Sequence, residues 1–168
     1  MPEPNWDHSL EETVFGRILL RTKERIQALG LISIEPDHIQ VRKLAWVDEV
    51  ELAPPYIIVS PRAEITNWPD GTNEQDETQY AVLISMVLAN SRDLTTKGMG
   101  LQLSWREAIR RSFQNKSIVS WPEMVLPSNC FFIQSYVESG DQFIEPAKRM
   151  QYDAQYWLVR FRVREPRT

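Results

Sequence analysis

The last stretch of the chain, residues 155–167, alternates with the period of a β-strand. Successive side chains of an extended chain point to opposite faces. One face would carry Trp157, Val159, Phe161 and Val163, and the other Tyr156, Leu158, Arg160, Arg162 and Arg164. The first face needs a core to cover it, so the chain has to build a sheet. The second face ends in three guanidinium groups about 7 Å apart, here called the arginine stripe (Arg160, Arg162 and Arg164).

The rest of the sequence supplies elements that can complete this sheet. Helical spacing of apolar residues over 9–29 and 101–113 predicts two amphipathic helices. A capping-box pattern from Ser9 to Glu12 marks the start of the first helix, and Gly30 suits its C-terminal cap. Further strands are predicted from β-rich runs at 39–44, 56–60, 80–89 and 130–138. In the last of these, we expect Phe131, Ile133 and Val137 to share one face and Phe132 and Tyr136 the other.

The central strand, a long connection and the N-terminal segment each have a distinct composition. The run 80–89 is apolar on both faces apart from Ser85, as expected of a central strand. Residues 62–78 are rich in turn formers and acidic side chains, which predicts a long exposed loop or hairpin. Residues 1–8 contain two prolines and no periodicity, so we expect an arm that is ordered where a neighbour holds it.

Together these elements predict an α+β fold. We expect a single two-layer domain over 9–168, preceded by a flexible arm over 1–8. Its mixed, mostly antiparallel sheet would have about four or five strands packed by two helices, with long loops. A chain of 168 residues that is 42% hydrophobic can bury such a core without disulfides or metals.

Charge and composition exclude several functional classes. The net charge of −4 argues against a general nucleic-acid binder, whose surface would be basic. The lone Cys130 fits a reducing compartment, and the acidic start lacks the pattern of a signal peptide. No run of about 18 apolar residues predicts a membrane span. We therefore expect a soluble, cytoplasmic protein.

Catalytic and ligand-binding patterns are weak. His8 and His38 have no second histidine or cysteine at metal-ligand spacing. The segment 98–100 (Gly-Met-Gly) lacks the rest of a dinucleotide or phosphate-loop motif, so a turn is favoured. Cys130 opens an apolar strand, where an inert thiol is favoured over a nucleophile. The acidic cluster Asp70, Glu74, Asp76 and Glu77 does not match a calcium loop, and a solvated loop is favoured over a cation site. We expect no catalytic residue, cofactor or metal.

The arginine stripe has two interpretations. It is either a charged sheet edge that discourages unwanted pairing, or a contact face for an acidic neighbour or for the phosphates of passing DNA. Tryptophans in the arm and connections favour a protein neighbour, because aromatic residues outside a core often anchor interfaces. These are Trp6, Trp46, Trp68 and Trp121.

Several segments also resemble, in order, those of small neck proteins of tailed bacteriophages. The resemblance spans about 20–168 and is nearest to the tail terminator, or tail-completion, group. It rests on the first helix, on 39–44, the acidic loop and 77–84, on Trp105-Arg106-Glu107, and on the closing run 158–165.

The resemblance implies a structural virion protein without catalytic residues. Such subunits form a ring, expected to be hexameric, at the head-proximal end of the tail tube. They contact the tube protein and the head connector or stopper, while DNA passes through the lumen without specific binding. No membrane is involved. Residues expected at subunit or partner contacts are the arginine stripe together with Glu74, Asp76, Glu77, Trp6 and Trp68.

Two alternatives remain open from the sequence. The first is another head-tail adaptor or tube-associated structural protein, which would share this composition. The second is a small cytoplasmic hydrolase, with Glu107 or Asp153 as its acid or base and a pocket under the 62–78 loop.

Overall fold

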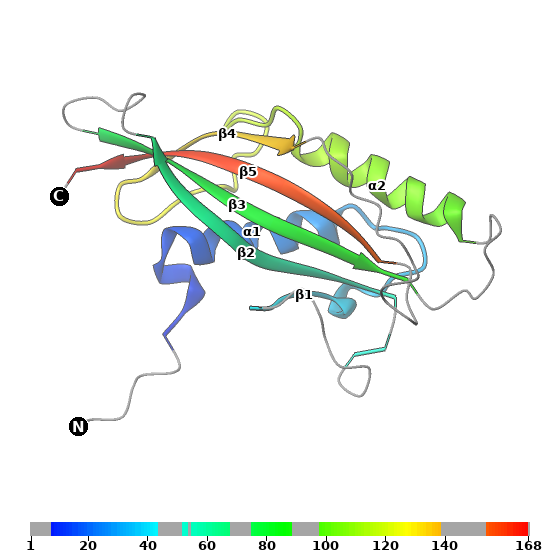
Figure 1. The fold of residues 1–168 in the computed structure, drawn as a ribbon. Coiled ribbons are helices and arrows are strands. Elements are labelled where there is room, and N and C mark those ends of the chain that lie inside the picture. The colour runs from blue at the N-terminus through cyan, green and yellow to red at the C-terminus, as the bar shows by residue number, and fades with distance from the viewer. Residues whose placement is uncertain are drawn as a thin grey trace, which may run out of the picture.

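The computed structural model describes residues 8–43, 52–53, 55–67, 75–88, 98–138 and 154–167. It contains one five-stranded sheet in the order β1-β2-β3-β5-β4 (Figure 1). The strands are β1 Ile39–Val41, β2 Tyr56–Asn67, β3 Gln75–Val87, β4 Phe131–Glu138 and β5 Ala154–Pro166. Only the β1–β2 pair is parallel. The predicted α+β class with a mixed, mostly antiparallel sheet is confirmed.

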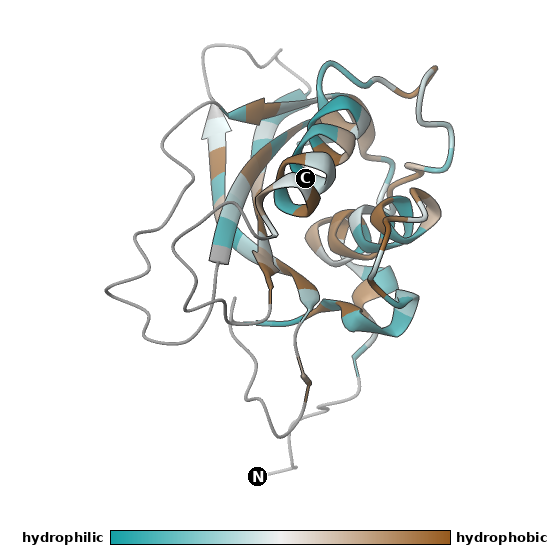
Figure 2. Ribbon diagram, turned by 90° about the vertical axis from the view of Figure 1, so that its right-hand side faces the viewer, coloured by the Kyte–Doolittle hydropathy of each residue, from teal (hydrophilic) through white to brown (hydrophobic). Residues whose placement is uncertain are grey.

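The two helices, α1 (Val14–Ala28) and α2 (Met99–Phe113), both cover the same face of this sheet (Figure 2). They bury Ile18, Ile26, Trp105, Ile109 and Phe113 against that face. The predicted C-terminal cap of the first helix is also confirmed, because Gly30 has a φ of +58° just after Leu29. No helix in the described ranges combines the length and apolarity that a bilayer crossing requires.

The terminal strand behaves as its alternation predicts. β5 pairs along its whole length with β3, from Gln75 opposite Pro166 to Val87 opposite Ala154, and β4 flanks its other edge. Trp157, Val159, Phe161 and Val163 are at most 5% exposed and face the helices. β3 lies at the centre of the sheet, and nearly all of its residues from Tyr80 to Val87 are buried.

The start of the first helix differs from the prediction. Ser9 caps a short 3-10 turn, η1 (Leu10–Glu12), and the α-helix begins only after Thr13, whose hydroxyl accepts from the Gly16 amide at 3.0 Å. η1 folds back closely on α1. A Cβ at Gly16 would lie 2.2 Å from the Leu10 carbonyl oxygen, so this approach requires glycine.

The segment 62–78 is predicted to be a long exposed loop or a hairpin, and the structure confirms the hairpin. β2 continues through Pro61 to Asn67 and β3 begins at Gln75, so Glu64, Asp76 and Glu77 lie in paired strands. The register shifts between Pro61 and Ala63, which marks a bulge. A bulge is one of the few places where a strand accommodates proline, because the ladder is already interrupted there.

A second bulge overturns the predicted faces of β4. The register shifts between Phe132 and Gln134, so the alternation changes phase at Ile133. Phe132 and Ser135 are buried on the helical side, while Phe131 is 54% exposed.

The expectation that Trp121 lies at an interface is also wrong. It is 2% exposed and packs among Phe113, Phe132 and Phe161, with ring centroids 5.5 to 6.0 Å away. This tryptophan fills the core and is not an interface residue. Its segment has no periodicity, so the sequence pattern could not reveal its burial. Trp46 lies outside the described residues.

Candidate functional site

The arginine stripe lies on the sheet face away from the helices. The Nε of Arg160 donates to Oε2 of Glu138 at 2.9 Å, across the β4–β5 pair. Glu138 retains 42% of its side-chain exposure and Arg160 retains 20%. This ion pair is therefore partly screened by water and contributes little to stability.

Arg162 forms a more buried pair with Glu77. Its Nε and Nη2 donate to the two carboxylate oxygens at 2.5 and 3.1 Å, a bidentate geometry. The Glu77 side chain is only 4% exposed, against 34% for Arg162. Glu77 and the arginine stripe thus meet within one subunit. Replacing Arg162 by an acid would set two carboxylates against each other and damage the fold.

Arg164 is the one member of the stripe that is exposed. It lies opposite Glu77 on β3 and Phe131 on β4, and within the described residues no hydrogen bond or ion pair is recorded for it. Asp76 pairs instead with Arg167, at 2.6 Å. Arg164 is therefore the stripe residue that can contact another molecule without first breaking an internal pair.

Three of the predicted contact residues, Trp6, Trp68 and Glu74, lie outside the described residues. The interface role of all eight predicted residues stays a prediction. The internal partners Glu138 and Arg167 have no local sequence signal, because the pairs they form depend on which strands lie side by side.

A polar cluster on the opposite sheet face was not predicted. The carboxylate of Glu165 accepts from the Tyr80 hydroxyl and, at 3.2 Å, from the Thr78 hydroxyl. Phe15 of α1 covers the Tyr80 ring at 5.0 Å. Burial raises the pKa of Tyr80, and its bond to Glu165 raises it further. Burial, with a smaller effect of the Glu165 charge, also raises the pKa of the Cys130 thiol, which favours the unreactive thiol over a nucleophile.

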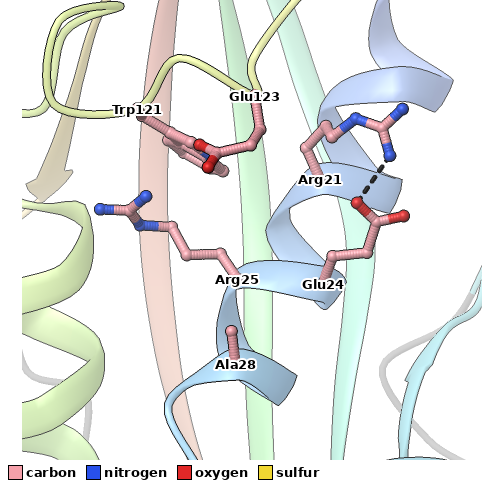
Figure 3. A pocket seen from close by; sticks show the side chains of 6 residues that line it. All are labelled: Arg21, Glu24, Arg25, Ala28, Trp121 and Glu123. Carbon is pink, nitrogen blue, oxygen red and sulfur yellow. Dashed lines mark hydrogen bonds and ion pairs between the residues drawn. The ribbon is translucent and has the colours of Figure 1, made fainter.

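A pocket of about 220 Å³ lies beside α1 (Figure 3). It is lined by Arg21, Glu24, Arg25, Ala28, Trp121 and Glu123. Its volume is below the roughly 300 Å³ at which small-molecule sites usually begin. Three of its charged side chains have partners: Arg21 pairs with Glu24 at 2.6 Å, and the Nε of Arg25 donates to the carbonyl and hydroxyl of Ser112.

Arg25 has a packing role in this pocket. Its guanidinium lies 4.5 Å from the centre of the Trp121 ring, and burial lowers its pKa. A cation on an aromatic face closes the edge of the core. In addition, no group of three or more potential metal ligands occurs among the described residues.

The chain matches no protein-family model and no curated protein. A solved structure does match. It is a chain from the virion of a native gene transfer agent particle, aligned over 92% of this chain and 98% of that chain. The identity is 14% and the TM-score is 0.51. At this identity the likeness establishes a shared fold across nearly the whole of both chains.

Proposed function

We propose that the protein is a structural virion component, and more specifically a tail terminator. It would form a ring at the head-proximal end of a phage tail tube and join the tube to the head connector, with DNA passing through the lumen. The observation that carries this proposal is the fold shared with a gene transfer agent virion chain over almost its full length.

The described surface supports a structural role. Among the predicted acid-base residues, Glu107 pairs with Arg111 on the outer side of α2, and Asp153 lies outside the described residues. The pocket beside α1 offers neither a nucleophile nor a histidine. Other head-tail adaptors and tube-associated proteins fit the same observations, so position on the particle separates them from a terminator.

Native mass spectrometry and negative-stain microscopy of the purified chain, with and without tail tubes, test this proposal. We expect hexameric rings that cap one end of the tube. Monomers at every concentration, with no assembly on tubes, would contradict it. Rings bound along the tube or at its distal end would favour the tube-associated alternative.

A charge reversal tests the contact face. Arg164→Glu should weaken ring assembly and leave the far-ultraviolet circular dichroism unchanged, because Arg164 is exposed. Arg110→Glu makes the same charge change on the exposed side of α2 and is the matched control. If both variants assemble like the parent protein, the arginine stripe is a solvated sheet edge.

A further inference from the structure

Among the described residues, one edge of the sheet is unpaired over half of a strand. β1 pairs with β2 only from Ile57 to Val59, and the Arg42 amide adds a last bond to the Val59 carbonyl. From Ser60 to Thr66, no described residue bonds to the outer edge of β2. Pro61, Arg62, Glu64, Ile65 and Thr66 are all exposed. Such an edge is a template for an added strand.

The opposite edge of the sheet is already covered. Lys116 and Ser135 exchange two backbone bonds, at 3.2 and 2.7 Å. The Val137 amide donates to the side-chain oxygen of Gln114 at 2.8 Å. The segment after α2 thus occupies the middle of the β4 edge, which leaves β2 as the described edge best suited to strand addition.

The sequence contains a segment that fits this edge. Residues 1–7 read Met-Pro-Glu-Pro-Asn-Trp-Asp. As an extended strand, this segment would place Pro2, Pro4 and Trp6 on one face and Glu3, Asn5 and Asp7 on the other. Successive residues also direct their amides to opposite edges, so both prolines fall on the same edge. Their missing N–H groups would face away from a partner, and the amides of residues 3, 5 and 7 would face it.

The length of this segment and its apolar face also suit the β2 edge. Seven extended residues span about 24 Å, close to the roughly 23 Å of strand from Ser60 to Thr66. Ile65 pairs with Gln79, whose side chain accepts from Tyr136 on the face away from α1. Ile65 is 44% exposed there. An added strand could lay Trp6 beside it.

We propose that residues 1–7 of one subunit add as an edge strand to β2 of a neighbouring copy of this chain. The contact joins two different surfaces, so its repetition closes a ring when the rotation between neighbouring copies divides a full turn evenly. The prolines then block addition of a further strand. The inference rests on the proposed assembly and names the segment and the edge through which copies would join.

Disulfide cross-linking in the full chain tests this contact, in a Cys130→Ser background. Asn5→Cys subunits carrying a size tag are mixed with untagged subunits carrying Glu64→Cys or Thr66→Cys. Both edge positions lie on the sheet face expected to receive Asn5, so a tagged-untagged dimer should form under mild oxidation. Ala63→Cys is the matched control, because its side chain lies on the other face and should cross-link at least about tenfold less.

The outcomes separate this contact from the proposed function. Rings in native mass spectrometry without a cross-link between copies would overturn the arm contact and leave the virion role standing. In chains that carry both Asn5→Cys and Glu64→Cys, a disulfide that forms only within each chain would also overturn it. Cross-linked open chains without rings would support the arm contact and contradict the terminator ring. Trp6→Ala should raise the concentration for half-assembly about tenfold, and an unchanged value would count against the contact.

Discussion

Among the described residues, Glu77 is the most deeply buried charged side chain. Its carboxylate is almost fully buried and accepts a bidentate bond from Arg162. Glu77→Gln keeps the shape and removes the charge, so we expect unfolding free energy to fall by about 2 kcal/mol, the range for bonds to charged groups. The value is below that of fully buried pairs because Arg162 is one-third exposed.

The matched control is Glu138→Gln. Its carboxylate accepts a single bond from Arg160 and is far more exposed than that of Glu77, so the loss should stay below about 1 kcal/mol. Urea denaturation of both variants measures the difference. Equal losses would mean that burial of Glu77 does not strengthen its pair.

The raised pKa of Tyr80 predicts that the free energy of unfolding falls at alkaline pH. Its pKa is raised in the folded protein, by burial first and by the bond to Glu165 second. The folded state therefore retains the phenolic proton at a pH where the unfolded chain, with its ordinary pKa of about 10, has lost it. The stabilisation is complete below about pH 10 and declines above it, with a slope of up to about 1.4 kcal/mol per pH unit.

Tyr80→Phe removes this titration and keeps the ring against Phe15. Urea unfolding between pH 9 and 11 should show a shallower decline in the variant than in the parent protein. Tyr136→Phe removes a hydroxyl bond to Gln79 elsewhere on the sheet and controls for the loss of one tyrosine hydroxyl. If Tyr80→Phe loses stability with pH as steeply as the parent protein, groups other than Tyr80 cause the alkaline loss.

At the scale of elements, the junction of η1 and α1 depends on Gly16. An added methyl group would meet the Leu10 carbonyl at 2.2 Å and the Thr13 hydroxyl at 2.5 Å. Gly16→Ala should therefore cost about 1–3 kcal/mol, as overpacking usually does. Gly100→Ala is the control, because no atom lies within 4 Å of its added Cβ. It should stabilise α2 by up to about 1 kcal/mol, and thermal unfolding distinguishes the two signs.

Sequence periodicity predicted the elements where one period runs without interruption. The buried face of β5 and the apolar stripe of α2 are examples. It failed at the two bulges, because a single inserted residue reverses the faces without changing composition. Turn formers and acidic residues over 62–78 predicted a loop or a hairpin, and strand pairing keeps Glu64, Asp76 and Glu77 within the hairpin's strands. Propensity is weaker than tertiary pairing at such positions.

The candidate site was predictable only in part. The alternation of β5 correctly placed the arginine stripe away from the core. The partners of Arg160 and Arg162 could not be predicted, since they lie 22 and 85 residues away and are brought close by strand order. Trp121 was missed for a different reason. It lies in a connection without periodicity, yet it supplies one of the largest side chains of the core.

For the whole molecule, assembly predicts that stability depends on protein concentration. A ring that binds only folded subunits shifts the equilibrium by mass action. We expect the Tm of the parent chain to rise when its concentration is increased a hundredfold. The rise should be smaller in Arg164→Glu and unchanged in Arg110→Glu. Calorimetry at several concentrations checks this, and a Tm independent of concentration in the parent would contradict a reversible ring.

The covered edge of β4 has a consequence for how many neighbours a subunit can hold. The segment around Lys116 occupies that edge, so each copy has one strand to donate and one described edge to accept it. Subunits that each donate one strand and accept one strand assemble into linear oligomers, with an unpaired strand at one end and an unpaired edge at the other. Closing the oligomer satisfies both ends at once. Adding a peptide with the sequence of residues 1–7 should therefore give shorter oligomers, and their length should fall as the peptide-to-subunit ratio rises.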